Sequence, residues 1–200
     1  RAEARPVPSD IHAWCRELEQ SAPGGDEARE AWLLTLYALS HHPEACPSAF
    51  VVENMSDQGA LEALLRRWLS THGPIEGDAL ELGCGIGGHA SVWADLTSGT
   101  VTLSDLRPRM LALGRALHRG QATSLPWRSM AQRYEPCHIT PARQVSDRVH
   151  YVVADALDPP FAAEHFKLLS ALNLLDTVRD PWMLLGQMDS LTATDGLLLL

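Results

Sequence analysis

The segment Gly83-Cys-Gly-Ile-Gly-Gly88 is the feature that most restricts what this chain can fold into. It follows the short apolar run 79–82 and precedes residues 89–96, whose apolar spacing is that of a helix. A glycine-rich turn between a parallel strand and a helix brings backbone N–H groups and a positive dipole end to a bound ligand. The order strand, glycine turn and helix therefore predicts an α/β fold with a nucleotide-like ligand at the turn.

Short apolar segments and helical periods alternate along the remainder of the chain. Strands are expected at 100–105, 149–153, 166–172 and 197–200, and helices at 110–117 and 181–191. This alternation is typical of right-handed crossovers and predicts a doubly wound, Rossmann-like parallel sheet. We expect a core at residues 77–200, with residues 120–148 as an insertion that breaks the alternation.

Residues 1–76 predict a helical extension that packs on this core. Apolar residues recur at helical spacing from Ile11 to Leu18, from Trp32 to Leu39 and from Leu61 to Leu69. Each apolar stripe is too narrow to form a core of its own, so these helices need the sheet as a packing partner.

Three carboxylates stand where predicted strands end. Asp105 closes the second strand, where a carboxylate accepts hydrogen bonds from ribose hydroxyls, and Asp155 follows the third, where a carboxylate accepts an adenine amine. Glu81 precedes the glycine turn, where it would repel a pyrophosphate and attract an ammonium group. Together the three acids predict a site for adenosine with a cationic amino-acid tail.

These motifs resemble those of class I, seven-strand S-adenosylmethionine-dependent methyltransferases over residues 77–200. The resemblance implies S-adenosylmethionine as the cofactor and methyl transfer as the reaction. It implies that the glycine turn binds the methionine end of the cofactor and that Asp105 binds the ribose. Asp155 and Ala156 would bind the adenine. The implied cofactor-binding residues are Glu81, Gly83, Cys84, Gly85, Gly87, Asp105, Leu106, Asp155, Ala156 and Asn173. The family's C-terminal antiparallel hairpin does not follow the fifth strand, so the sequence is either a fragment or has an exposed apolar edge strand. We expect a fragment.

The segment Asn173-Leu-Leu-Asp176 carries a narrower resemblance. It is similar to a segment of DREV-type protein-histidine methyltransferases and, more loosely, of the methyltransferase part of ovothiol synthases, which methylate imidazole nitrogens. The resemblance implies two catalytic residues: Asn173 beside the transferred methyl, and Asp176 as hydrogen-bond acceptor for the target ring. A carboxylate on the distal N–H fixes the tautomer of a neutral imidazole and raises its basicity. The same two residues could instead cap the following turn.

Two other function classes share parts of this pattern. Gly83, Gly85 and Gly88 also satisfy GxGxxG, which with Asp105 is typical of NAD(P)-dependent oxidoreductases. A non-catalytic adaptor built on the same sheet is the other alternative. An oxidoreductase should bind NAD and show no heat on titration with S-adenosylhomocysteine. An adaptor should bind neither ligand, or bind without turnover.

Composition restricts the partners. A net charge of -9 argues against generic nucleic-acid binding, and no apolar run approaches the roughly 18 residues of a membrane helix. Four cysteines without a CxxC framework suit a reducing cytosol. The pairs His41-His42 and Cys137-His138 have no second pair at zinc-site spacing, so no metal is predicted. We expect a cytoplasmic protein with a small-molecule or peptide substrate; the oligomeric state has no sequence signal.

The window 107–148 contains eight arginines and only two acids, Glu135 and Asp147. One interpretation is a docking face for an acidic partner, because guanidinium groups bind carboxylates bidentately. The other is a solvated surface in a chain that prefers arginine to lysine throughout.

Overall fold

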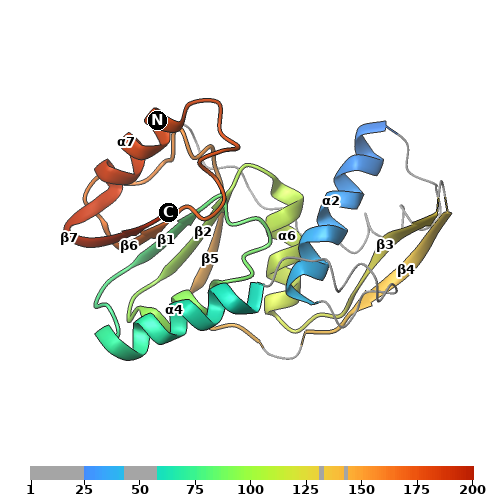
Figure 1. Cartoon of the computed structure of the whole chain (residues 1–200), viewed down its shortest axis with the longest axis horizontal. Helices are drawn as coiled ribbons and strands as arrows, with labels where there is room; N and C mark the ends of the chain where they lie inside the picture. Colours follow the sequence, from blue (N-terminus) through green and yellow to red (C-terminus); the bar gives the residue numbers. More distant parts are fainter. Residues whose placement is uncertain (1–24, 43–57, 131–132, 142–143) are drawn as a thin grey trace.

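The computed structural model describes residues 25–42, 58–130, 133–141 and 144–200. Its centre is a five-stranded sheet with the order β5-β2-β1-β6-β7, in which every strand pair is parallel (Figure 1). The strands are β1 Ala79–Leu82, β2 Val101–Asp105, β5 Val149–Val153, β6 Phe166–Ser170 and β7 Thr192–Leu199. The predicted α/β class with a Rossmann-like parallel sheet is confirmed.

The strand order reverses at β1, which has β2 on one side and β6 on the other. In register, Leu82 stands beside Ser104 of β2, and Glu81 stands beside Ser170 of β6. The carboxyl ends of these strands therefore meet at one edge of the sheet. Ligands of doubly wound sheets bind at such a reversal point.

Helices cover both faces of the sheet. Helices α4 Gln58–His72 and α5 Ala90–Leu96 pack with β1 and β2 in one apolar cluster, while α7 Pro181–Leu191 packs with β6 in another. Figure 1 shows α4 and α7 on opposite sides of the sheet. Their apolar faces bury the strands from both sides, which explains why the strands are nearly continuous apolar runs in the sequence.

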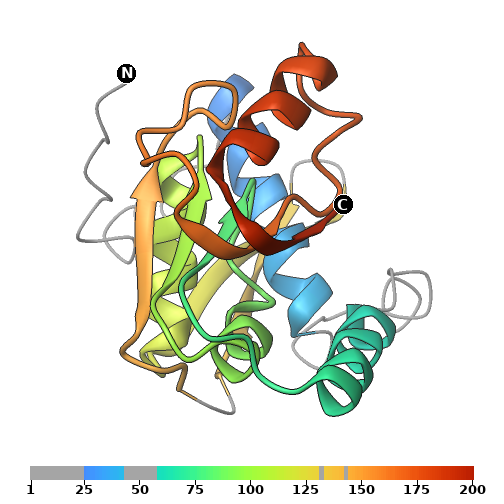
Figure 2. The ribbon, with the colours of Figure 1, turned by 90° about the vertical axis from the view of Figure 1, so that its left-hand side faces the viewer.

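Helices α2 Gly25–His41 and α6 Pro108–His118 pack together at the β2 side of the sheet (Figure 2). An ion pair joins Arg109 of α6 to Glu30 of α2. The helix predicted around Trp32 to Leu39 is thus part of α2, and the stripe from Leu61 to Leu69 lies in α4. The stripe from Ile11 to Leu18 lies outside the described residues. None of the described helices has the length and apolar character that a membrane span needs.

The insertion contains two antiparallel strands that the alternation did not predict, β3 Thr123–Met130 and β4 Arg133–Ile139. Helix α2 packs on this hairpin, where Thr35 Oγ1 donates to the carbonyl oxygen of Pro126 at 3.0 Å. The rings of Trp32 and Trp127 lie 5.3 Å apart between centroids. Proline is tolerated here because both strands of a two-stranded sheet are edge strands.

Strand β7 begins at Thr192, five residues before the predicted start at 197. The pairing of β6 with β7 shifts register between Phe166 and Leu168. Such an irregularity lengthens one strand without the strict alternation that sequence analysis detects.

Arg148, from the arginine-rich window, serves the fold. Its guanidinium donates to the carbonyl oxygens of Ala94 at 2.7 Å, Thr97 at 2.9 Å and Gly99. Helix α5 ends among these carbonyls, which have no partner within the helix. One planar guanidinium group satisfies all three carbonyl oxygens. Arg148 is therefore neither part of a docking face for an acidic partner nor a solvated surface residue, the two interpretations given for residues 107–148.

Candidate functional site

Two adjoining cavities lie at the sheet edge where β1, β2, β5 and β6 end. The smaller, of about 330 Å³, is lined by Leu36, Tyr37, Ser40, His41, Glu81, Gly83, Cys84, His89, Leu172 and Asn173. The larger, of about 530 Å³, includes Leu33, Tyr37, Gly83, Gly85, Asp105, Leu106, Arg107, Met110, Ala154, Asp155, Ala156, Leu157, Asn173, Leu174 and residues 177–179. Tyr37, Gly83 and Asn173 line both and form the junction between the cavities.

The glycine turn requires its glycines. Gly83, Gly85 and Gly87 have φ values of +67°, +59° and +73°, a region that side chains other than glycine rarely occupy. A Cβ on Gly83 would lie 2.6 Å from Leu174 Cδ1, and one on Gly87 would lie 2.6 Å from Leu103 Cδ1. Gly87 lines neither cavity, so its role is to let the turn pack on β2.

Asp105 anchors the turn to the end of β2. Its Oδ2 accepts a hydrogen bond from the Gly85 N–H at 2.9 Å, and its Oδ1 accepts one from the Arg107 N–H at 2.8 Å. Burial raises the pKa of this carboxyl above its ordinary value, against the opposing effect of the two N–H donors. Asp105 and the exposed Leu106 both line the larger cavity, where the sequence predicted ribose-binding residues.

Asp155 and Ala156 line the same larger cavity from the end of β5. The Leu157 N–H donates to Asp155 Oδ1 at 2.9 Å, which fixes the side chain. The structure thus brings the predicted ribose and adenine residues into one cavity, although they are separated by about fifty residues in the chain. Two carboxylates at neighbouring strand ends match the hydroxyl and amine donors of adenosine.

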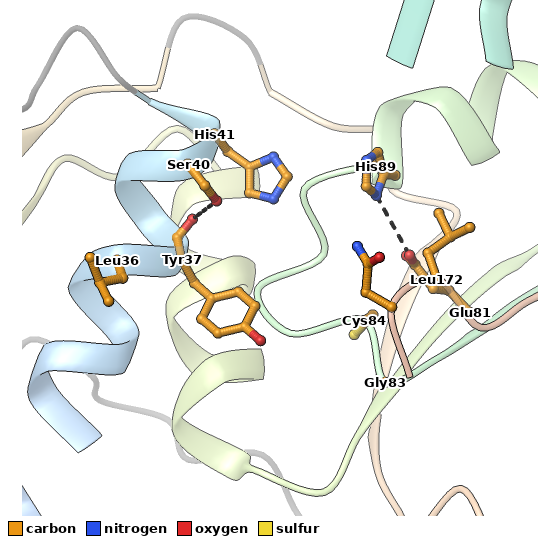
Figure 3. Close-up of a pocket in the computed structure, with 10 residues that line it drawn as sticks. Leu36, Tyr37, Ser40, His41, Glu81, Gly83, Cys84, His89 and Leu172 are labelled. Atoms are coloured by element: carbon orange, nitrogen blue, oxygen red, sulfur yellow. Dashed lines mark hydrogen bonds and ion pairs between the residues drawn. The ribbon is translucent and has the colours of Figure 1, made fainter. Parts of the chain in front are cut away.

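Glu81 is buried beside the smaller cavity, with 3% of its surface exposed. The indole N–H of Trp93 donates to Glu81 Oε2 at 2.8 Å. On the other carboxylate oxygen, His89 Nδ1 lies 3.7 Å from Oε1 (Figure 3). Burial, followed by the charges of Glu81 and Asp105, raises the pKa of the Cys84 thiol, so this side chain stays protonated.

Helix α2 supplies the opposite wall of the smaller cavity. Figure 3 shows Tyr37, Ser40 and His41 on this helix, facing the loop that carries His89. The Tyr37 ring lies over Gly85, within 3.3 Å of where a Cβ would stand. Burial, and then the neighbouring His89, His42 and His118, lowers the pKa of His41 to about 4, so its ring is neutral near neutral pH.

The sequence did not identify Tyr37, His41 or His89 as site residues. Tyr37 and His41 lie more than forty residues before the glycine turn, and only the packing of α2 brings them there. His89 is adjacent to the turn and four residues before Trp93, a spacing that places both side chains on one side of α5. That spacing could have identified His89 as a site residue from the sequence.

The two predicted catalytic residues have different positions. Asn173 lies at the junction of the cavities with a φ of +55°, a left-handed conformation that asparagine tolerates better than most residues. Asp176 is exposed and lines neither cavity. Of the two, only Asn173 borders the space where a ligand would lie.

Solved proteins with a similar fold include a chain of the complex between the Haloferax volcanii Trm112 methyltransferase activator and a candidate methyltransferase. That match has a TM-score of 0.52 and 17% identity, over 82% of this chain and 57% of that chain. A candidate methyltransferase of Bacillus halodurans matches with a TM-score of 0.50 and 22% identity, over 69% and 49% of the chains. The Haemonchus contortus phosphoethanolamine N-methyltransferase 2, solved with S-adenosyl-L-methionine, matches with a TM-score of 0.47 and 21% identity, over 68% and 27%.

The chain spans 27% to 57% of the length of these three solved proteins, and 52% of a candidate S-adenosyl-L-methionine-dependent methyltransferase from Methanococcus maripaludis. A comparison with curated proteins found no match. The sequence profile of the methyltransferase domain family matches residues 80–200, which is more than half of the chain. These comparisons do not favour a nicotinamide dinucleotide. The chain therefore belongs to the methyltransferase domain family, and this membership supports S-adenosylmethionine as its cofactor.

Proposed function

We propose that the protein transfers a methyl group from S-adenosylmethionine to an imidazole nitrogen, in a histidine peptide or a small histidine derivative. The observation that carries the proposal is the junction of the two cavities, where Tyr37 and Asn173 both line the space beside Gly83. An aromatic face and an amide suit a neutral heteroaromatic ring, which stacks on the one and hydrogen-bonds to the other.

The two cavities fit the cofactor. The larger offers the carboxylates of Asp105 and Asp155 to the ribose and adenine donors, and the backbone of the glycine turn lines it at Gly83 and Gly85. The smaller contains a buried ring nitrogen of His89 without a hydrogen-bond partner. The bound cofactor supplies a methyl group already activated by its sulfonium, so the protein's contribution is alignment and exclusion of water.

The charge of the smaller cavity favours a neutral nucleophile. Its described lining contains the carboxylate Glu81 and no lysine or arginine. An anionic acceptor would lie beside this carboxylate without a counter-charge. A nitrogen lone pair needs no strong base for attack, so this environment favours N-methylation over O- or C-methylation.

Asp176 is assigned the role of holding the distal N–H of the acceptor ring. It lies three residues beyond Asn173 on the exposed loop after β6. A ring that enters at the junction and protrudes toward this loop would donate its distal proton to the carboxylate. That contact keeps the attacking nitrogen unprotonated and nucleophilic.

The test is incubation with S-adenosylmethionine and histidine peptides or free imidazoles, followed by mass spectrometry. We expect a mass increase of one methylene group on the ring, with Asp176→Asn lowering the rate. Asp189→Asn, an exposed acid on α7, is the matched control and should leave the rate unchanged. A protein that binds the cofactor and methylates no imidazole contradicts the acceptor assignment; full activity in Asp176→Asn contradicts only the role of Asp176.

Two broader proposals concern the domain organisation of the chain and its cellular compartment. Helices α2 and α4 both pack on the core, which supports residues 1–76 as a helical extension of residues 77–200. Among the described residues, Cys84 carries a thiol that takes part in no disulfide. This chemistry suits a reducing compartment, and we propose the cytosol.

A further inference from the structure

The pair of Glu81 and His89 is a buried carboxylate and imidazole in the wall of the smaller cavity. His89 is 9% exposed and Glu81 is 3% exposed. His89 Nδ1 faces Glu81 Oε1 at 3.7 Å, while Trp93 occupies the other carboxylate oxygen. Both oxygens of Glu81 therefore face groups of the protein, and a ligand in the cavity meets His89.

The second ring nitrogen of His89 has no partner. Nε2 is fully buried and makes no hydrogen bond. Because the carboxylate attracts a proton to Nδ1, we assign the tautomer with the proton on Nδ1 and a lone pair on Nε2. A buried lone pair without a donor is unfavourable, which indicates that a ligand supplies the donor.

The surroundings select a cationic donor. The described lining of the smaller cavity has a carboxylate and no cationic side chain. The ring of His41 packs edge-on against His89, with 5.6 Å between ring centroids and 88° between the planes. A donor carried by an ammonium group compensates the Glu81 charge through the imidazole.

We propose that His89 Nε2 accepts a hydrogen bond from the α-ammonium group of the cofactor, and that Glu81 acts as a positioning residue through His89. In this assignment Glu81 does not touch the cofactor; it fixes the tautomer of the residue that does. The proposal rests on the cofactor of the family and not on the imidazole acceptor, so it stands or fails independently of the acceptor.

Two substitutions of His89 separate the ring nitrogens. His89→Asn keeps a polar group near the position of Nδ1, beside Glu81, and removes the distal acceptor. His89→Gln places an amide near the position of Nε2 and restores an acceptor there. His150→Asn, on an exposed histidine of β5, is the control for a histidine change away from the site.

The experiment is calorimetric titration with S-adenosylhomocysteine and with 5′-methylthioadenosine, which lacks the amino-acid end. We expect His89→Asn to weaken S-adenosylhomocysteine binding at least about tenfold and 5′-methylthioadenosine binding by less than about twofold. His89→Gln should recover most of the loss. Misfolding of a variant would weaken both ligands together, so the ratio of the two affinities is the readout.

Glu81→Gln provides a second variant that does not alter His89. A glutamine amide facing Nδ1 reverses the tautomer and turns Nε2 into a donor, so the same selective loss is expected. The losses of Glu81→Gln and His89→Asn should not add, because both act on one contact. Unchanged S-adenosylhomocysteine affinity in His89→Asn, or equal weakening of both ligands, overturns the proposal; if only Glu81→Gln weakens binding, Glu81 contacts the ammonium directly.

Discussion

Two glycines in helix interiors should respond in opposite directions to the same substitution. Gly114 lies in α6, where a Cβ would overlap the carbonyl oxygen of Ile86 in the glycine turn. Gly186 lies in α7 and is exposed, and nothing stands within 4 Å of its Cβ position. Helix propensity favours alanine over glycine by about 1 kcal/mol at both positions. Only at Gly114 does packing oppose this gain.

The magnitudes follow from these contacts. Gly186→Ala should raise the free energy of unfolding by about 1 kcal/mol. Gly114→Ala must move α6 away from the turn, because a backbone oxygen cannot rotate aside as a side chain would. Overpacking of this kind costs about 1–3 kcal/mol, and the rigid partner places the cost at the upper end, so a net loss of about 2 kcal/mol is expected.

The assay is urea unfolding of the two variants and the parent protein, followed by titration with S-adenosylhomocysteine. Gly114→Ala should also weaken this ligand, because Ile86 belongs to the turn, whereas Gly186→Ala should leave the affinity unchanged. Equal signs for the two stability changes would refute the inference that close packing of α6 on the turn requires Gly114.

Three further predictions concern single contacts. Arg148→Lys should lower the free energy of unfolding by about 1–2 kcal/mol in urea titrations, because one ammonium cannot satisfy three carbonyls as the guanidinium does; an unchanged midpoint would show that these bonds contribute nothing. Asp105→Ala should weaken S-adenosylhomocysteine by roughly 1–3 kcal/mol in calorimetry, since the ribose acceptor and the anchor of Gly85 are both lost; full affinity would reject the ribose assignment. Burial lowers the pKa of His41 and of His118 from 6.5 to about 4 in the folded protein, so the unfolded state binds more protons at acid pH. The stability that these residues contribute is complete above pH 6.5 and is lost as the pH falls toward 4, by on the order of 3 kcal/mol per group; unfolding midpoints against pH, with His118→Gln flattening the slope, are the check.

The centre of the sheet could be predicted because its strands are buried on both faces. Such strands are short apolar runs between helical periods, and Ala79–Leu82, buried at every position, was recognisable for this reason. The β3–β4 hairpin was not, because Pro126 and Pro136 stand opposite each other in it and proline argues against a strand. The described part of the hairpin packs against α2 and α6, and no local pattern encodes these contacts.

The candidate site also contains residues that could be predicted from the sequence and residues that could not. Asp105 and Asp155 follow predicted strands directly, so their place at the sheet edge could be derived from the chain order alone. Tyr37 reaches Gly85 through the packing of α2 on α6, a long-range contact with no local signature.

For Glu81, the sequence motif predicts the position of the residue but not its hydrogen-bond partners. The acid before the glycine turn could be located from the sequence, but its partners could not be read from the motif itself. They are set by His89 and Trp93, whose separation of four residues brings both to the same side of α5 and toward β1. A carboxylate enclosed in this way acts on a ligand through the imidazole. The same acid in a chain with apolar residues at both positions would face the ligand alone, so the identity of these two residues decides how Glu81 contributes.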